Sequence, residues 1–590
     1  MDKLIYHQLK KQLGHHEHPC FNSLVEILSG PTGLSTGGYP YMGGKAYGQF
    51  LNGVPHLFLK GRKIIEWIAL LERELPSVRL IAKQLDSVKR SLAVLRNMVF
   101  SAGVTAPPDL WLIRQVISCL QDLGVFEVLS DHGFHSVQDI SRKLKLDPHL
   151  LSVDLKFLYS RSYLIKNSEQ YGIQMNNAIK NLLNLKPLET VELETNWVKL
   201  IADHIKGNSQ LTKAIATYCQ LSPSGPESDE GHWVAKSSDV ELGYKILPIV
   251  LACRVLNLSS ELKKGENVYK LIPEKPYAEL LYKAGYIDES GLVTIYGERV
   301  FTRGPGPFGI IHTYRTYMLA HKKALRGLMG EHWVVRGENV AASQDANRKS
   351  FKLANDALDR FCYDYGFSYN VFIEHAVGQG EALKQRLQLS GDKNIQYFGA
   401  DLEDAAIEAA KKFQADGLVS SNTKFISKAD IGHPEILVSK IVSAGFDSEG
   451  AVMMVGNGFH EVRGQTNGKM IDIFKKYQES GLLLIFTEES GLSDQDLLDT
   501  AWNTYHAGFR YVHDISGQGL RPAVDREEDE IYSWSKCAKL GGYLVMQEYT
   551  SKTRSIFPYP RADGYNPSIS VTYFCVPKVL ARRYGVAEPE

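Results

Sequence analysis

The chain has 590 residues, of which 44% are apolar and 23% charged, and its 67 basic side chains balance its 67 acidic ones. This length suggests about three or four domains, and the composition is typical of soluble globular protein. A net charge of zero argues against a nucleic-acid-binding protein whose affinity comes from neutralising phosphates.

The cysteines and the apolar segments predict a cytoplasmic protein. The seven cysteines are scattered and form no Cys-x-x-Cys pair, which fits a reducing compartment better than a disulfide framework. The first residues lack the apolar stretch of a signal peptide. The longest apolar stretch, Ile246 to Leu258, is interrupted by Arg254 and is too short to span a bilayer. We therefore expect a protein that binds neither a membrane nor nucleic acid.

Residues 1–105 form a predicted helical or adaptor region. Its first part is rich in glycine and aromatic residues and is loop-like, whereas its second part carries apolar side chains at helical spacing, interrupted at Pro76. The histidines near its start are expected to be a solvated run rather than a metal site; they are His15, His16 and His18.

Residues 106–200 follow the order helix, helix, helix, hairpin, which predicts a winged-helix-like domain. Gly124 ends the first helix, Ser136 caps the second, and Asp147 followed by a proline opens the third. The alternative is an unrelated helical bundle. Residues 201–350 are predicted to be mainly helical and to form a lid or substrate wall.

Residues 351–590 alternate apolar, strand-like runs with helical stretches. This alternation predicts an α/β domain with a mostly parallel sheet, in which ligands bind beyond the carboxyl ends of the strands. The predicted strands are Asn370–His375, Ile395–Ala400, Thr423–Lys428, Gly450–Gly456, Leu482–Thr487 and Ser568–Cys575. The predicted helices are Glu381–Leu389, Asp404–Phe413, Pro434–Ala444, Gly468–Gln478 and Asp494–Val512.

A glycine turn follows the first predicted strand. The motif is Glu374-x-Ala376-x-Gly378-x-Gly380, which leads from a strand into a helix. Glycines at such a turn let the backbone approach a ligand closely. Asp401 stands at the end of the second strand, about twenty residues on, where a carboxylate can bind both ribose hydroxyls of a nucleoside.

The end of the third predicted strand completes a site that fits an adenosyl ligand. Asp430 can accept a hydrogen bond from the adenine amino group, and Ile431 beside it can cover the ring. Leu402, directly after the predicted ribose ligand, is assigned to the same site.

A histidine and a glutamate end the fourth and fifth predicted strands. His460 and Glu488 therefore emerge from the same edge of the sheet, where a substrate would lie. A histidine oriented by a carboxylate is an acid/base pair. The alternative is that the carboxylate next to Glu488 only caps the following helix.

Two further histidines lie seven residues apart, on one face of a predicted helix. With His460, His506 and His513 would make a nitrogen-rich metal site to which Gln518 could add an oxygen ligand. The alternative, that each histidine packs in the core with a hydrogen-bond partner, has equal support from the sequence.

The core motifs resemble those of class I S-adenosylmethionine (SAM)-dependent methyltransferases. The family's acidic residue and spaced glycines match the turn after the first strand, except that Ala376 stands where the family usually has its first glycine. The resemblance implies a Rossmann-like core, with Asp401 as the ribose ligand and Asp430 on the adenine side. An NAD-binding Rossmann domain is the alternative, and the acid after the third strand argues against it.

The order of the regions is similar to that of apratoxin-type methyltransferases, which build branched starter units in polyketide synthase loading modules. This resemblance implies C-methylation of the α-carbon of a malonyl-type group on the phosphopantetheine arm of an acyl carrier protein, beside other synthase domains. It also implies a transition metal, iron or manganese, that stabilises the enolate as a Lewis acid. The preferred ligands are His460, His513 and Gln518, with His506 in reserve.

Other functions are compatible with the same residues. Without a metal, His460 and Glu488 would form the base pair of the C-methyltransferase. A SAM-dependent O-methyltransferase of a small-molecule hydroxyl, with His460 as general base, is the main alternative. A non-catalytic adaptor that retains the fold is a third possibility.

Overall fold

The structure is a computed structural model that falls into two compact units. The first unit comprises Met1–His332, Ser493–Val512 and Ile556–Asn566, and the second comprises Trp333–Leu492, His513–Ser555 and Pro567–Glu590. The predicted division into four regions remains a prediction. The described residues are 3–13, 19–34, 40–53, 60–130, 133–173, 177–222, 235–329, 337–391, 394–500, 506–525, 530–553, 555–556 and 566–586. The histidines predicted to form a solvated run lie outside them.

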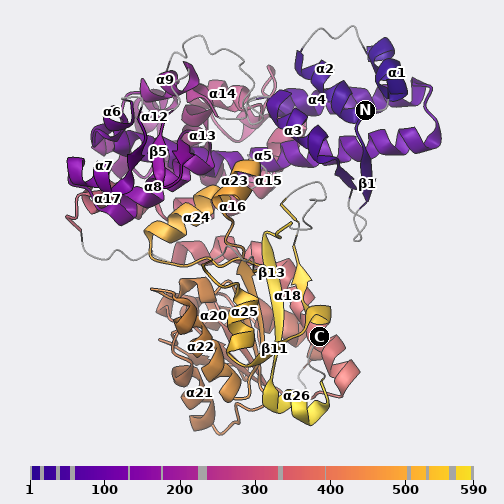
Figure 1. The fold of residues 1–590 in the computed structure, drawn as a ribbon, viewed down its shortest axis with the longest axis vertical. Helices are drawn as coiled ribbons and strands as arrows, with labels where there is room; N and C mark the ends of the chain where they lie inside the picture. The colour runs from indigo at the N-terminus through magenta and orange to yellow at the C-terminus, as the bar shows by residue number, and fades with distance from the viewer. Residues whose placement is uncertain are drawn as a thin grey trace. The chain divides into compact units, whose positions relative to one another are not determined.

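The first unit is mainly helical (Figure 1). Its N-terminal part contains α1 (Lys3–Leu13), α2 (Pro19–Leu28), β1 (Thr32–Leu34), β2 (Pro40–Met42), α3 (Gly44–Gly53), α4 (Gly61–Glu74) and α5 (Ala82–Asp122). Later helices are α6 (Val125–Leu129), α9 (Asn177–Leu183), α10 (Thr190–Glu194), α11 (Trp197–Ile205), α12 (Thr212–Cys219), α13 (Ser237–Val255), α14 (Glu274–Lys283), α15 (Ile295–Arg303), α16 (Pro305–His312) and α17 (Arg315–Leu325).

The long helix α5 corrects one sequence prediction. The helix predicted to end at Gly124 is the last part of α5, which begins at Ala82 and continues through Pro107 and Pro108. A proline inside a helix removes one backbone hydrogen bond and normally ends or kinks the helix. Side chains on all sides of this stretch are buried, so tertiary packing holds it helical despite the two prolines.

The winged-helix-like order is present in the first unit. Ser136 caps α7 (Val137–Leu144) by accepting a hydrogen bond from the backbone N–H of Asp139. Asp147 caps α8 (Pro148–Ser160) in the same way. The hairpin that follows pairs β4 (Ile165–Asn167) with β5 (Gln170–Gly172), and β5 also pairs with β3 (His135–Ser136).

The apolar stretch noted in the sequence belongs largely to α13, which is buried along most of its length against α5. A helix inside a bundle is apolar on every side for this reason. Among the residues that the structure describes, no helix is long and apolar enough to cross a membrane.

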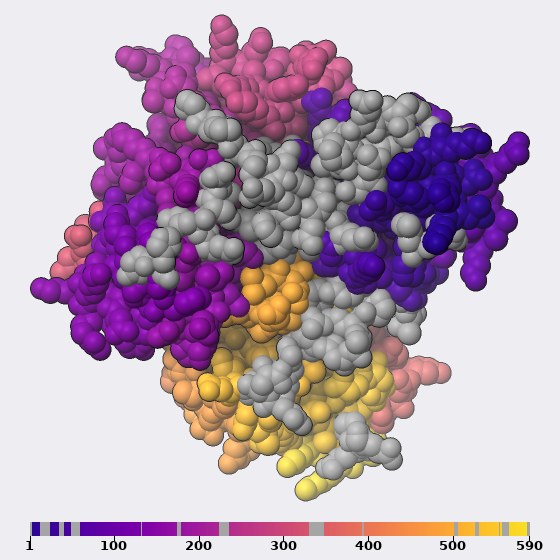
Figure 2. All heavy atoms as spheres, turned by 45° about the horizontal axis from the view of Figure 1, so that its top comes forward, coloured from indigo at the N-terminus to yellow at the C-terminus, as the bar shows by residue number. Residues whose placement is uncertain are grey.

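A late segment of the chain, Ser493–Val512, belongs to the first unit. It contains α23 (Asp494–Thr500), which packs on α8, and the first turns of α24 (His506–Ile515). Figure 2 shows this segment in orange beside the purple residues of the same unit. Within the helix predicted over this region, the described residues form α23 and α24.

A buried ion pair fastens this late segment to the first unit. Asp109 on α5 and Arg161 after α8 are both fully buried, with 2.5 Å between Oδ2 and Nη2. Asp109 also accepts a hydrogen bond from the backbone N–H of Gly508, and Arg161 donates one to the carbonyl of Leu497. The pair thus ties α5, the end of α8 and the late segment together.

The second unit is built around a mostly parallel sheet, as predicted. Its strand order is β11-β13-β10-β9-β6-β7-β8, and β13 is antiparallel to both of its neighbours on this path. The strands are β6 (Val371–His375), β7 (Gln396–Ala400), β8 (Lys424–Ile426), β9 (Val452–Gly456), β10 (Leu483–Glu489), β11 (Tyr543–Val545), β12 (Ser551–Lys552) and β13 (Ser570–Pro577). The six predicted strands are all present, with ends shifted by one or two residues, and β11 and β12 are additional.

Helices cover both faces of this sheet and enclose two apolar cores. One core joins the strands to α21 (Pro434–Ser443), α22 (Asn467–Glu479) and α25 (Trp534–Leu540). The other joins them to α18 (Gly337–Tyr365), α19 (Glu381–Ser390), α20 (Asp404–Ala415) and α26 (Lys578–Tyr584). Because helices cover both faces of the sheet, a ligand can approach it at the polar ends of its strands.

Candidate functional site

The carboxyl ends of five neighbouring parallel strands meet at one edge of the sheet. In sheet order these strands are β8, β7, β6, β9 and β10. Along the chain, β6, β7 and β8 are added in one direction across the sheet. The next strand, β9, pairs with the other side of β6, so the strand order reverses at β6. Open α/β sheets bind ligands in the crevice at such a point.

The turn after β6 has an unusual backbone. Gly378 and Gly380 have φ angles of 52° and 89°, and Ala376 has a φ of 56°. All three lie in the left-handed region that glycine adopts most easily. The position of Ala376 therefore requires a left-handed backbone, which glycine adopts more easily than a residue with a side chain.

The carboxyl group of Glu374 points into the helix that follows the turn. It is 1% exposed, and its Oε2 accepts a hydrogen bond of 2.9 Å from the backbone N–H of Leu383 in the first turn of α19. Burial raises the pKa of Glu374 to about 8, although the backbone N–H groups of Leu383 and Ala382 oppose the shift. Glu374 therefore holds the turn against α19, and its predicted contact with a cofactor remains a prediction.

The predicted ribose ligand lies against the glycine turn. Asp401 directly follows β7, and its Oδ2 accepts a hydrogen bond of 3.2 Å from the backbone N–H of Gly378. Its Oδ1 accepts another, of 3.0 Å, from the N–H of Glu403. A carboxylate can accept several hydrogen bonds, which is what a pair of ribose hydroxyls requires. Leu402 beside it is half-buried.

The predicted adenine-side residues follow β8. Asp430 is half-buried, and its Oδ1 accepts a hydrogen bond of 2.8 Å from the backbone N–H of Gly432. Ile431 is 7% exposed and packs close to Gly458, where an added Cβ would lie 3.1 Å from its Cδ1. The residues assigned to nucleoside binding thus follow β6, β7 and β8, three strands that are adjacent in the sheet.

His460 and Glu488 form a buried hydrogen-bonded pair. His460 lies in a short 3₁₀ turn after β9, and its Nδ1 is 2.8 Å from Oε2 of Glu488 on β10. Oε1 of the same carboxylate accepts a hydrogen bond of 2.5 Å from the backbone N–H of Phe459. Glu488 is 1% exposed. The carboxylate therefore fixes the ring so that Nδ1 donates to it and Nε2 points away from it.

The charges around His460 favour its protonated form. Burial alone would lower the pKa of His460, but the carboxylates of Glu488 and Glu461 outweigh burial and raise it to about 10. Nε2 of His460 lies 3.6 Å from Oε1 of Glu461. At neutral pH the protonated form therefore predominates, and the neutral imidazole is a strong base when it forms.

The predicted metal ligands are only partly brought together. The rings of His460 and His513 are 5.0 Å apart between centroids, in the second unit. Gln518 lies nearby, but its Oε1 accepts a hydrogen bond from Ser516 Oγ and its Nε2 donates to Glu461. His506 belongs to the first unit, beside Phe509, so its relation to the other ligands remains a prediction.

The metal site therefore remains a prediction. Nδ1 of His460 donates to Glu488, which leaves Nε2 as the atom that could bind a metal ion, and Oε1 of Gln518 accepts from Ser516. Among the described residues, no group of three or more histidine, cysteine, aspartate or glutamate side chains could hold a metal ion. The chemistry of the site is therefore derived below from the acid/base pair.

Comparison with known proteins gives only distant similarities. The sequence matches no protein-family model and no curated protein. The CurJ carbon methyltransferase has 11% identity and a TM-score of 0.33, over 88% of this chain and 99% of that one. The DszA carbon methyltransferase has 13% sequence identity and a TM-score of 0.33, over 86% of this chain and 96% of that one. An O-methyltransferase family 2 protein from Planctomyces limnophilus, in complex with apigenin, has 11% sequence identity and a TM-score of 0.31. The match covers 80% of this chain and 96% of that one.

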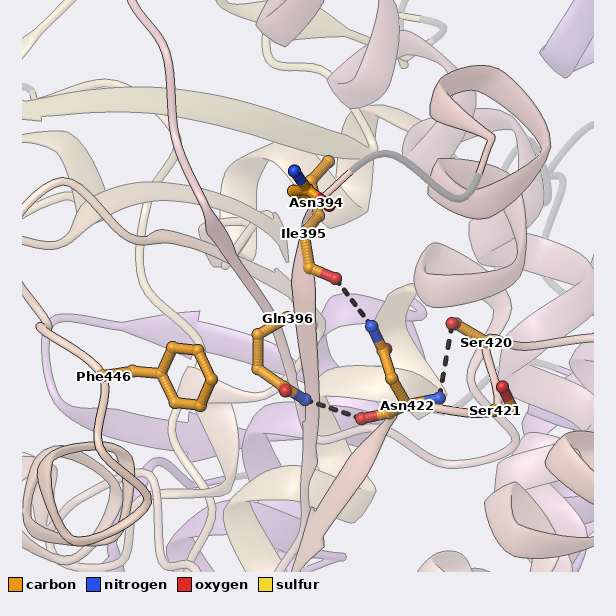
Figure 3. Close-up of a pocket in the computed structure, with 7 residues that line it drawn as sticks. All are labelled: Asn394, Ile395, Gln396, Ser420, Ser421, Asn422 and Phe446. Carbon is orange, nitrogen blue, oxygen red and sulfur yellow. Dashed lines mark hydrogen bonds between the residues drawn. The ribbon is translucent and has the colours of Figure 1, made fainter.

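A separate pocket opens at the other end of the sheet. It has a volume of about 370 Å³ and lies at the amino end of β7. Figure 3 shows that two of the amides lining it are bound to the backbone, since Asn422 donates to the carbonyl of Ile395 and Gln396 donates to that of Asn422. The pocket is therefore distinct from the carboxyl edge, and its amides hold the β7 and β8 ends together.

Sequence reasoning missed three polar residues at the carboxyl edge. Glu461 follows His460 directly, so its proximity could have been expected from the sequence. His375 ends β6 and Asn457 follows β9, positions that the strand pattern alone places at this edge. Nothing in their spacing distinguished them from neighbouring residues, because their importance depends on hydrogen bonds that only the folded chain reveals.

Proposed function

We propose that the second unit is a SAM-dependent methyltransferase. The observation that carries this proposal is the hydrogen bond between Gly378 and Asp401 at the same edge of the sheet as the His460–Glu488 pair. A nucleoside-binding turn and an acid/base pair on adjoining strand ends suit transfer from an adenosyl donor to a bound acceptor. When bound, SAM supplies an electrophilic methyl group on its sulfonium.

The donor-binding residues of this chain have separate tasks. The carboxylate of Asp401, fixed by two backbone N–H groups, accepts from the ribose hydroxyls. Asp430 accepts from the adenine amino group, while the buried Ile431 supplies an apolar wall for the ring. Because the backbone positions these groups before the ligand arrives, little ordering is needed on binding.

The acceptor is proposed to be the α-carbon of a malonyl-type group on the phosphopantetheine arm of an acyl carrier protein. An α-proton of this kind is weakly acidic, and the raised pKa of His460 makes its neutral form a strong base for it. After Nε2 takes the proton, the imidazolium stays paired with Glu488 and lies beside the enolate charge that it has created. The remaining requirement is to hold the carbanion and the methyl group in line.

Binding of S-adenosylhomocysteine, measured by calorimetry, tests the donor site. We expect the wild-type protein to bind it and the Asp401→Ala variant to bind it about 10- to 100-fold more weakly, since a hydrogen bond to a charged group is lost. Asp404→Ala is the matched control because Asp404 is exposed and pairs with Lys428. A wild-type protein that binds neither S-adenosylhomocysteine nor SAM would contradict the proposal.

A product assay tests the acceptor. Incubation with SAM and malonyl-loaded carrier protein is expected to add one methyl mass to the acyl group, and a chelator is expected to leave the yield unchanged. Loss of product with chelator, restored by iron or manganese, would show that the ligands rearrange around a metal. Methylation of free phenols in place of the carrier-bound group would favour the O-methyltransferase.

A further inference from the structure

Two asparagine side chains face each other at the carboxyl end of β9. Asn457 directly follows the strand, and its Nδ2 donates a hydrogen bond of 3.0 Å to Oδ1 of Asn347 on α18. Asn457 has a φ of 55°, and its backbone N–H donates to the carbonyl of Thr487 over 2.8 Å. Asn347 is 6% exposed. The two amides are therefore held in fixed positions by β9, β10 and α18.

The pair approaches closely because the residue before Asn457 is a glycine. A Cβ on Gly456 would lie 2.4 Å from the ring of Phe351 and 3.3 Å from Nδ2 of Asn347. Such contacts would push α18 away from the strand end. Gly456 thus brings the helix and its amide against the edge of the sheet, which is a feature of a built site rather than of a loosely packed surface.

The hydrogen bonding of the pair is incomplete. Oδ1 of Asn457 is buried and accepts no hydrogen bond in the described part of the chain. His375, at the end of the neighbouring β6, has the same deficiency: its Nδ1 accepts from the N–H of Ala376, and its buried Nε2 has no partner among the described residues. A buried polar group without a partner is costly, so polar atoms of a ligand are expected to satisfy this stretch of the edge.

The strand order shows which part of the donor would reach the carboxyl ends of β6 and β9. The ribose and adenine ligands, Asp401 and Asp430, follow β7 and β8. The rest of the donor must extend the other way along the edge, over β6 to β9. Three strand spacings separate the end of β8 from the end of β9, roughly 14 Å. An amino-acid tail on the nucleoside would therefore end beside Asn457.

The nearby carboxylate is not available for this tail. Glu374 on β6 is directed into α19 and is 1% exposed, as described above. An amino-acid tail carries both an ammonium group, which needs an acceptor, and a carboxylate, which needs a donor. Two amides that share one hydrogen bond leave one oxygen and one NH₂ group for a ligand, whichever way round the amides are placed.

We propose that Asn457 and Asn347 bind the amino-acid end of the adenosyl donor. Oδ1 of Asn457 accepts from the α-ammonium group, and Nδ2 of Asn347 donates to the α-carboxylate. This inference rests on the proposed methyltransferase function and adds the residues that distinguish the full donor from a nucleoside without the tail. It also gives α18 a function, because the helix that precedes β6 supplies half of the recognition.

Calorimetry with two ligands tests the pair. S-adenosylhomocysteine carries the amino-acid tail, and 5′-methylthioadenosine lacks it. Asn457→Gly, which suits the left-handed backbone, and Asn347→Leu are each expected to weaken S-adenosylhomocysteine binding by about ten- to hundredfold. Binding of 5′-methylthioadenosine is expected to change less than about twofold, because it makes no contact with the pair.

Asn370→Leu is the matched control. It removes the same amide at an exposed position just before β6, at the amino end of the strand, and is expected to leave both affinities unchanged. Equal weakening of both ligands by the Asn457 and Asn347 variants would make the pair structural and overturn the proposal, as would no weakening at all. A wild-type protein that binds neither ligand would instead overturn the methyltransferase function itself.

Discussion

Replacing His460 by glutamine is expected to lower kcat for methyl transfer by about 10²- to 10⁴-fold, the usual contribution of a positioned base. Glutamine can still donate a hydrogen bond to Glu488 but cannot accept the substrate proton. Single-turnover assays of carrier-bound product measure the effect. Affinity for 5′-methylthioadenosine, which lacks the amino-acid tail, is expected to stay near the wild-type value, because His460 follows β9 and the nucleoside ligands follow β6, β7 and β8.

The paired variant separates a base from a structural histidine. Glu488→Gln keeps the shape of the partner but removes its charge, so the ring loses part of its orientation and its pKa falls. We expect a smaller loss of kcat than in His460→Gln, together with a pH profile moved to lower pH. A His460→Gln variant with wild-type kcat would eliminate His460 as the base.

The pH dependence of the rate follows from the charges around His460. The neutral imidazole is the reactive form and its pKa is raised to about 10, so kcat is expected to rise about tenfold per pH unit through the neutral range and to level off near that value. Glu461→Gln removes one of the two carboxylates that raise the pKa, and should move the midpoint to lower pH. His513 is the other titratable side chain packed against the ring. A flat profile in both proteins would contradict the assignment.

The fold of the second unit could be predicted because its signals are local. Each buried parallel strand is a continuous apolar run, and each helix between them has its own cap or periodicity. The strand β11 was missed because Tyr543–Val545 is only three residues long and gains its strand geometry by pairing with β13. The long α5 was missed for the opposite reason, since Pro107 and Pro108 signal an end that the surrounding packing overrides.

The candidate site could be predicted in position but not in hydrogen bonding. Strand ends place Asp401, Asp430 and His460 at one edge, because parallel strands share the direction of their carboxyl ends. The direction of Glu374 into α19 and the engagement of Gln518 by Ser516 depend on contacts made only after folding. His506 belongs to the first unit because the segment after β10 packs on α8 before the chain returns to the second unit. No local sequence pattern predicts this path.

Replacing Arg161 by methionine is expected to lower the free energy of unfolding of the first unit by about 3–5 kcal/mol, because it leaves the carboxylate of Asp109 buried without its partner. Urea unfolding followed by tryptophan fluorescence, to which Trp111 on the same helix as Asp109 contributes, measures the change. Replacing both partners, Asp109→Leu with Arg161→Met, is expected to recover most of the loss, since the double variant buries no charge.

The pH dependence of the stability lost in the Arg161→Met variant provides a second check. Burial raises the pKa of Asp109 to about 6 even with Arg161 present, against the opposing effects of Arg161 and the Gly508 N–H. A folded-state pKa above the unfolded value means that the ionised carboxylate costs stability, and the cost grows as pH rises above about 4. Without Arg161 the pKa of Asp109 rises further, so the variant should lose more stability at pH 8 than at pH 5. Gly508 and Leu497 bond to the same pair, so the loss should also release the late segment. Faster proteolysis of this segment in the variant would show the release. An equal loss at both pH values would mean that packing by the arginine side chain, rather than its charge, stabilises the unit.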